Sequence, residues 1–221
     1  VFYTGLYHAL IHPNVLSDVN GEYPAMESAE IRTAEGNRYT VFSLWDTYRN
    51  LHQLLTLVYP ERQLEMVRSM VGMYREWGWL PKWELYGRET FTMEGDPSIP
   101  VIVDTWMKGL RDFDMDAAYE AMRKSATTPG ARNRMRPDID PYIEKGYVPL
   151  GFYARDLSGD NSVSHALEYY IADHALSLLA DSLGKKDDAA LFRARSLGYK
   201  NYYSTESGTF RPITKEGKFL T

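Results

Sequence analysis

The change of hydrophobic period near Ser43 constrains the fold of this chain more than any other feature of its sequence. Residues 1–42, before that point, are rich in turn-forming pairs and keep no long period, which predicts loops with short strands. After it, apolar residues recur every three or four positions, which is the spacing of an amphipathic helix. The chain is therefore expected to be all-α, preceded by a loop-rich segment with short strands.

The helical pattern divides into six segments. They are expected at residues 43–59, 61–77, 96–110, 114–125 and 162–183, and from about residue 187 onward. Gly78 and Gly184 stand where helix C-caps are expected, and Asp96 followed by proline is typical of a helix start. Short turns alternate with irregular stretches at 78–95 and 127–161, so we expect helical hairpins packed side by side, with functional groups on the long loops.

The composition limits partners and chemistry. The net charge is −5, and the only basic cluster lies in a stretch that contains proline and glycine but no alternating aromatics: Arg123, Lys124, Arg132, Arg134 and Arg136. We therefore predict a solvated loop there and no nucleic-acid partner. The absence of cysteine excludes disulfides, thiolate metal sites and a cysteine nucleophile. No apolar run reaches the length of about 18 residues that a membrane span needs, so no transmembrane segment is expected.

Metal-binding residue types form no complete pattern. The five histidines lack the spacing of a zinc site. Asp18, Asn20 and Gly21 have the spacing that begins a calcium loop, but the later ligands of that loop are missing. The residues therefore identify no metal ligands.

The loop at residues 79–90 holds the densest set of candidate functional residues. Tryptophans, acids and glycines are crowded there between two expected helices. Aromatic faces suit the C–H faces of sugars, and carboxylates suit hydroxyls or a glycosidic oxygen. On residue types alone, Trp79 and Trp83 more often fill the space inside such a hairpin and Glu89 is more often a surface carboxylate, so the structural roles are favoured at this point.

Residues 43–49 hold the second candidate. Asp46 lies in the first turn of an expected helix, beside Trp45 and three residues before Arg49. A carboxylate in that position favours the helix dipole and pairs with arginine, so a structural role is open here too.

Short motifs along the chain match those of one protein family, in the same order. Residues 12–21 are similar to its Pro-Asn-Val-Phe-Ser-Asp-Val-Asp-Gly stretch, and residues 42–49 match its Phe-Ser-Leu-Trp-Asp-Thr-Tyr-Arg residue for residue. The match continues at 80–83, 88–95, 100–104, 146–149, 162–169 and 199–201. On these motifs the chain resembles glycoside hydrolase family 92, the calcium-dependent exo-acting α-mannosidases, over nearly all of its 221 residues.

The resemblance implies a fold and a reaction. Family enzymes join an N-terminal β-sandwich to an (α/α)6 barrel, so residues 1–221 are expected to be part of one (α/α)6 catalytic domain, with the sandwich and the rest of the barrel outside the chain. The implied reaction is the inverting removal of terminal α-linked mannose from glycans such as N-glycans. The implied location is periplasmic or secreted.

The resemblance also assigns roles to residues. By position, Glu89 looks like the general acid, and Trp45 with Asp46 looks like a contact for the mannose in the −1 subsite. Trp83 and Arg88 are the further candidates for substrate binding. The family's base lies in a Gly-Asn-Asp-Asp motif that this chain lacks, and several calcium ligands lie in later segments. Calcium is thus expected in the full-length enzyme, its ligands here are unknown, and the isolated fragment is expected to be inactive.

Glu89 differs from the family pattern in its neighbours. The common form has Asn before the acid and Met-Ile-Gly-Tyr-His after it, where this chain has Arg88 and Met-Glu-Gly-Asp-Pro. The linkage preference is therefore open. Desolvation by Trp79, Trp83 and Tyr86 is expected to raise the pKa of Glu89, as an acid catalyst needs, with Arg88 directed elsewhere.

Two alternatives remain at this point. One is a non-catalytic helical module that binds a glycan or a protein, in which Glu89 is dispensable. The other is an (α/α)6 hydrolase acting on glucosides.

Overall fold

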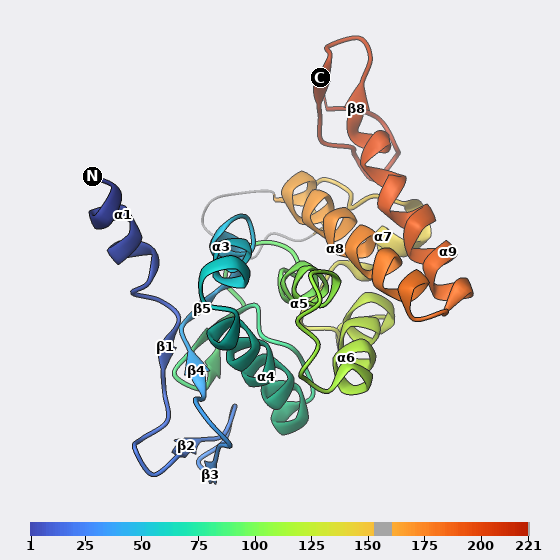
Figure 1. Ribbon diagram of the computed structural model, residues 1–221. Coiled ribbons are helices and arrows are strands. Elements are labelled where there is room, and N and C mark those ends of the chain that lie inside the picture. The colour runs from blue at the N-terminus through green and yellow to red at the C-terminus, as the bar shows by residue number, and fades with distance from the viewer. Residues whose placement is uncertain (153–160, 221) are drawn as a thin grey trace. The chain divides into compact units, whose positions relative to one another are not determined.

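The computed structural model describes residues 1–152 and 161–220. The chain forms two compact units, each with its own helices and short strands (Figure 1). The first consists of Val1–Met93 and Val101–Met122, and the second of Glu94–Pro100 and Arg123–Thr221. Helix α5, Ser98–Met107, and helix α6, Met115–Thr127, therefore each contribute residues to both units.

The first unit is mainly helical and also carries seven short strands. Its elements are α1 Phe2–Ala9, β1 Asn14–Val15, β2 Glu22–Pro24, β3 Ile31–Thr33, β4 Tyr39–Thr40, β5 Phe42–Ser43, α2 Leu44–Thr47, α3 Leu51–Val58, α4 Pro60–Trp77, β6 Trp83–Leu85 and β7 Arg88–Glu89. The strands pair antiparallel as β1-β4, β2-β3 and β5-β6-β7. The short strands expected before residue 43 are present, whereas β6 and β7 lie in a stretch expected to be loop.

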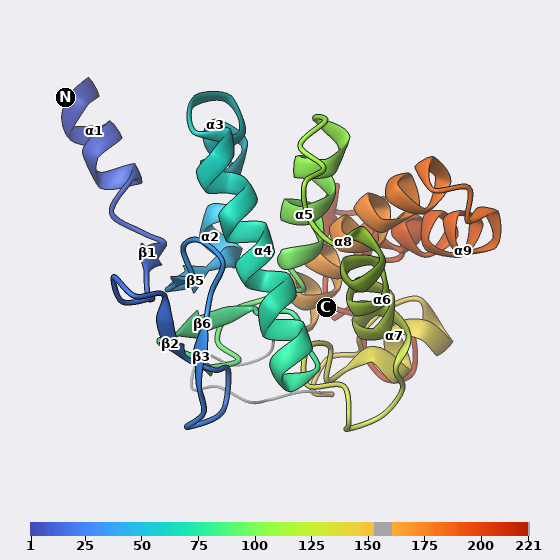
Figure 2. The same cartoon turned by 60° about the horizontal axis from the view of Figure 1, so that its bottom comes forward.

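Helix α4 begins and ends where the sequence predicts. Pro60 is at its first position, where a missing N–H costs no hydrogen bond, and Gly78 closes it with φ 92°, a left-handed conformation that suits glycine. One face of α4 is buried in the core through Met66, Val67, Met70 and Val71. Helix α3 packs against α4, and the two lie side by side in both views (Figures 1 and 2). This pair is one of the expected helical hairpins.

The single helix expected at residues 43–59 is in fact two helices. The turn α2 ends at Thr47, and α3 starts only after Asn50, whose φ of −155° and ψ of −33° are not helical. Ser43 belongs to strand β5, and the N–H of Leu44 is bonded to the carbonyl of Lys82. The first turn is thus tied to the sheet, and the apolar period alone does not reveal the break.

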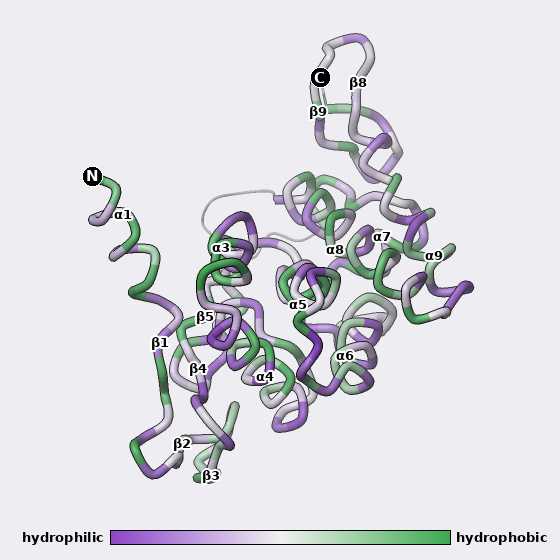
Figure 3. Tube along the Cα trace, viewed as in Figure 1, coloured by the Kyte–Doolittle hydropathy of each residue, from purple (hydrophilic) through white to green (hydrophobic). Residues whose placement is uncertain are grey.

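Helix α1 was not expected, because the turn signals after it dominate the first 42 residues. None of its residues is buried, and Phe2, Tyr3 and Tyr7 are exposed. Apolar stretches of α1 appear green in Figure 3.

The second unit contains the remaining elements. These are α7 Ile139–Lys145, α8 Ser162–Ser182, α9 Lys186–Ser196, the 3-10 helix η1 Leu197–Tyr202, and the strand pair β8 Tyr203–Ser204 and β9 Thr209–Phe210. Helices α8 and α9 pack together as a hairpin. Tyr142, Tyr169, Tyr170 and Tyr202 form much of the core. The prediction for 127–161 missed α7, and part of that stretch, residues 153–160, lies outside the described residues.

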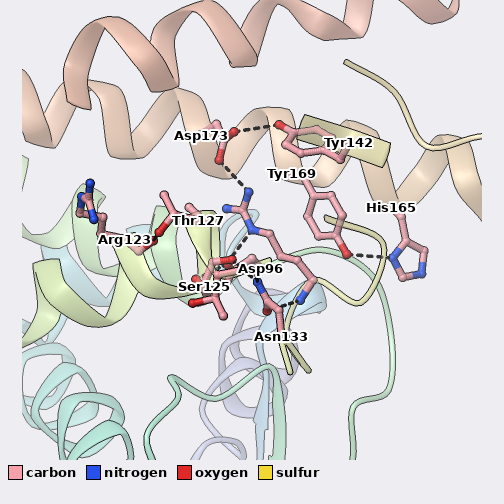
Figure 4. A network of polar contacts seen from close by, with 12 residues as sticks. Asp96, Arg123, Ser125, Thr127, Asn133, Tyr142, His165, Tyr169 and Asp173 are labelled. Carbon is pink, nitrogen blue, oxygen red and sulfur yellow. Dashed lines mark hydrogen bonds and ion pairs between the residues drawn. The ribbon is translucent and has the colours of Figure 1, made fainter. Parts of the chain in front are cut away.

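A buried ionic network corrects the prediction of one solvated basic loop. Arg136 is fully buried, its Nε donates to Asp96 Oδ2 at 3.0 Å, and its Nη1 donates to Asp173 Oδ1 at 2.7 Å. Asp173 also accepts the Tyr142 hydroxyl at 2.8 Å (Figure 4). Because buried charges persist only when paired, the two aspartates explain why this arginine leaves the surface. Arg132, by contrast, is exposed.

Asp96 was expected to cap a helix, but its carboxylate also has partners inside the second unit. Besides Arg136, it accepts a hydrogen bond from the Ser125 hydroxyl at 2.6 Å.

Among the described residues, no helix is both long and apolar enough to cross a membrane.

Candidate active site

A β-hairpin positions Glu89. Strands β6 and β7 are joined by the two residues Tyr86 and Gly87, whose φ angles of 50° and 80° are both left-handed, as in the tight turns that fit the twist of a hairpin. The register pairs Leu85 with Arg88 and Glu84 with Glu89. Two glutamates therefore stand directly opposite each other.

The Glu89 carboxylate is held by backbone donors. Oε2 accepts the N–H of Lys82 at 2.8 Å, while Oε1 accepts those of Trp83 at 3.0 Å and Phe91 at 2.8 Å. The residue is only 7% exposed. Desolvation raises the pKa of Glu89, and the three N–H bonds and the charge of Lys82 oppose this without reversing it. The upward direction of the pKa shift and desolvation as its cause agree with the expectation, whereas the expected contribution of Tyr86 does not.

Arg88 is directed away from that carboxylate, as expected. Its side chain is 67% exposed and its Nη1 lies 3.4 Å from Glu27 Oε2. The other oxygen of Glu27 accepts the backbone N–H of Glu89 at 2.7 Å. Glu27 thus contacts both residues of strand β7, a role that no sequence signal indicated.

The aromatic residues around Glu89 differ from one another in exposure. Tyr86 lies at the tip of the turn and is 59% exposed, so it does not supply the expected wall around Glu89. Trp79 and Trp83 are half-buried. Trp83 acts on Glu89 through its backbone N–H.

Glu84 is a second buried carboxylate that the sequence analysis missed. It accepts hydrogen bonds from the Thr40 hydroxyl at 2.8 Å, the Val41 N–H at 3.1 Å and the Gly87 N–H at 2.5 Å. Desolvation raises its pKa, and the charge of Glu89 adds to the rise while the hydrogen bonds oppose it. The signal that was available is Tyr86-Gly87, a two-residue turn between short segments that each contain a glutamate.

Asp46 is exposed on the short helix α2. Its Oδ2 accepts a hydrogen bond from the Ser43 hydroxyl. The neighbouring Trp45 is half-buried, and the Arg49 guanidinium stacks 4.9 Å from the centre of the Trp45 ring and donates from Nε to the Trp45 carbonyl at 3.1 Å. Arg49 thus has contacts with Trp45 whichever role Asp46 plays.

One sheet joins the two candidate segments. Ser43 of β5 pairs with Trp83 of β6, and β6 pairs with β7. The hydrogen-bond partner of Asp46 is therefore a direct cross-strand neighbour of Trp83, and Glu89 lies one strand further on. The structure brings together segments that are about 40 residues apart in the sequence.

Histidine and acidic side chains identify no metal site within residues 1–152 and 161–220. No three histidine, aspartate or glutamate side chains gather there into a metal-binding cluster. The side-chain oxygen of Asn20 accepts the N–H of Glu22 at 3.1 Å, so Asn20 stabilises a turn.

Comparisons with known proteins agree on one family. The family model of the glycosyl hydrolase family 92 catalytic domain matches residues 1–221. A family 92 alpha-mannosidase of Bacteroides thetaiotaomicron, solved in complex with mannoimidazole, is 36% identical, with a TM-score of 0.88 over 100% of this chain and 28% of its own. An inverting mannosidase of the same family and organism is 30% identical, also with a TM-score of 0.88, over 99% of this chain and 29% of its own.

A curated protein is similar over most of the chain. An uncharacterized secreted glycosidase of the fungus Arthroderma benhamiae is 26% identical over 214 residues, which are 95% of this chain and 23% of that protein. The chain thus spans between 23% and 29% of the length of these relatives. The match over all of its residues shows that the chain belongs to glycosyl hydrolase family 92 and represents a part of that family's catalytic domain.

Proposed function

We propose that the longer protein containing this chain is an exo-acting α-mannosidase that removes terminal α-linked mannose from glycans with inversion. The observation that carries the proposal is the 36% identity, along the entire chain, to an alpha-mannosidase solved with mannoimidazole. The name of the inverting relative supports the stereochemistry. We further propose that the helices form part of an (α/α)6 barrel.

Glu89 is the proposed general acid. An inverting glycosidase needs a protonated carboxyl near the leaving oxygen, and burial raises the pKa of Glu89 in the required direction. In this role Glu89 would pass its proton to the glycosidic oxygen as the bond to the sugar breaks. The base that activates the attacking water would come from outside residues 1–221.

A second role for Glu89 is supported by its contacts. Both of its oxygens already accept backbone N–H groups, and such donors favour the ionised carboxylate over the acid. A carboxylate in this setting joins the ends of the hairpin and stabilises it. The two roles differ in whether a proton is transferred, so kinetics separates them.

Asp46, Trp45, Trp83 and Arg88 are the proposed sugar contacts. Asp46 is exposed and ionisable, and Trp45 presents a half-buried ring beside it, which is a pairing suited to a sugar's hydroxyls and C–H face. Exposed Arg88 could reach the leaving-group side. Calcium is proposed for the longer protein, in keeping with the family resemblance. An extracytoplasmic location is proposed by analogy with the secreted fungal relative.

The test uses the full-length protein with α-mannobioses and with dinitrophenyl α-mannoside. We expect mannose to be released and the first product to be the β-anomer by NMR. Glu89→Gln should slow the mannobioses by about 10²–10⁴-fold and the activated substrate far less, because only a poor leaving group needs a proton. Glu84→Gln is the matched control, since it alters the same hairpin without removing the proposed acid.

The outcomes are distinct. Equal losses of rate on both substrates in a folded Glu89→Gln variant would assign Glu89 to the hairpin and remove it from catalysis. Binding of mannosides by the wild type without turnover would favour the non-catalytic binding module.

A further inference from the structure

A chain of buried side-chain hydrogen bonds lies behind the turn that carries Asp46. His52 of α3 is fully buried. Its Nε2 is 3.1 Å from the Thr47 hydroxyl of α2, and its Nδ1 is 2.9 Å from Gln63 Oε1 of α4. Gln63 Nε2 donates in turn to the Thr105 hydroxyl of α5 at 2.9 Å. All four residues belong to the first unit.

His52 is suited to this position in its neutral form. A neutral imidazole has one donor and one acceptor nitrogen, and each nitrogen here has one polar partner. Burial lowers the pKa of His52 to about 4, against the opposing effect of its hydrogen bond to Gln63 and the charge of Asp104. The ring is therefore uncharged near neutral pH and acts as a rigid bridge between α2 and α4.

Thr47 links this bridge to Asp46. Its hydroxyl lies within hydrogen-bond distance of both the Ser43 carbonyl, at 3.2 Å, and His52 Nε2, and has one proton to donate between them; the hydroxyl of Ser43 donates to Asp46. Helix α2 has only four residues, and a single turn gains little stability from its own backbone bonds. External contacts must therefore fix its orientation. Buried Leu44 supplies one contact and Thr47 supplies another.

We propose that His52 is a positioning residue, which through Thr47 holds helix α2 in the orientation that presents Asp46 to mannose. Gln63 and Thr105 orient the imidazole from the side of α4 and α5. This inference rests on the proposed function, because it takes Asp46 as a sugar contact. It adds a residue with no direct access to the sugar.

Two matched pairs of variants test the bridge in the full-length protein. Thr47→Val removes the hydroxyl, whereas Thr47→Ser keeps it. His52→Asn retains a polar group at the Nδ1 position toward Gln63, whereas His52→Gln retains one at the Nε2 position toward Thr47. The readouts are the Kd for mannoimidazole, hydrogen exchange of the backbone amides of residues 44–48, and the melting temperature.

Thr47→Val and His52→Asn are expected to weaken mannoimidazole binding about tenfold, the effect of losing roughly one hydrogen bond, and to accelerate exchange in residues 44–48. Thr47→Ser and His52→Gln should stay close to the wild type in both. A purely structural role would lower the melting temperature of Thr47→Val and His52→Asn and leave Kd and local exchange unchanged, which would overturn the inference.

The exchange measurement separates this inference from the proposed function. A wild-type protein that does not bind mannoimidazole would overturn the proposed function and the sugar-binding half of the inference. Faster exchange at residues 44–48 in Thr47→Val but not in Thr47→Ser would still support the conclusion that the contact between Thr47 and His52 fixes helix α2.

Discussion

Replacing Arg136 with methionine is expected to destabilise the second unit severely. The substitution keeps much of the side-chain volume but removes the cation that Asp96 and Asp173 both contact, at 3.0 and 2.7 Å. Asp173 keeps Arg195, whose Nε lies 2.9 Å from its other oxygen, whereas Asp96 is left buried without the arginine. Breaking a buried ion pair by removing one partner costs about 3–5 kcal/mol. For a unit of about 100 residues that corresponds to a fall in melting temperature of roughly 14–24 °C.

The assay is calorimetric melting of the full-length protein, with two comparisons. Arg132→Met makes the same change four residues earlier at an exposed site and should leave the melting temperature nearly unchanged. The double variant Arg136→Met with Asp96→Asn should melt above Arg136→Met alone, because the neutral amide no longer needs a cation and retains Ser125 as a partner. If Arg136→Met melts at the same temperature as Arg132→Met, Arg136 is not held in a buried ionic network, and the prediction of a solvated basic loop is correct.

Three further predictions concern the first unit. Asp46→Asn should lower kcat/KM for mannosides about ten- to a hundredfold at constant melting temperature, since a hydrogen bond to a charged group contributes about 1.5–3 kcal/mol. A lower melting temperature with unchanged kcat/KM would show that Asp46 stabilises its helix and does not contact the sugar. Because the folded pKa of His52, about 4, is below its ordinary value of 6.5, the unfolded chain binds the proton first as pH falls. Wild-type stability should therefore drop relative to His52→Gln by about 3 kcal/mol between about pH 7 and pH 4, and parallel denaturation curves would contradict this. Gly78→Ala should cost about 1 kcal/mol, measured by melting, because its φ of 92° strains any residue with a Cβ.

Local signals predicted the long helices well. The boundaries of α4 follow from Pro60 and Gly78, and α8 begins and ends within a residue of its expected limits. The break between α2 and α3 could not be predicted, because Leu44 and Leu55 are both buried and keep the apolar period across it. A tertiary contact to the Lys82 carbonyl, not a sequence signal, ties the first turn to the sheet.

The candidate site shows the same division between local and long-range causes. The outward direction of Arg88 was expected from its neighbour Glu89, whereas Glu89 is buried without the expected contribution of Tyr86. The pairing of Glu84 with Glu89 depends on strand register, and the burial of Arg136 depends on aspartates about 40 residues away in either direction. A single sequence does not show that Asp96 and Asp173 meet Arg136, so a basic cluster that looked uniform contains one residue of the core.

The number of residues in the turn at Tyr86 and Gly87 determines which side chains of strand β7 face Glu84. Side chains alternate between the two faces of a strand, so one residue inserted into the turn would exchange the faces of Arg88 and Glu89. An arginine would then occupy the place lined by the N–H groups of Lys82 and Phe91, which bind an anion. Surface loops commonly tolerate insertions, but relatives of this chain should vary in the residues at these two positions and never in their number.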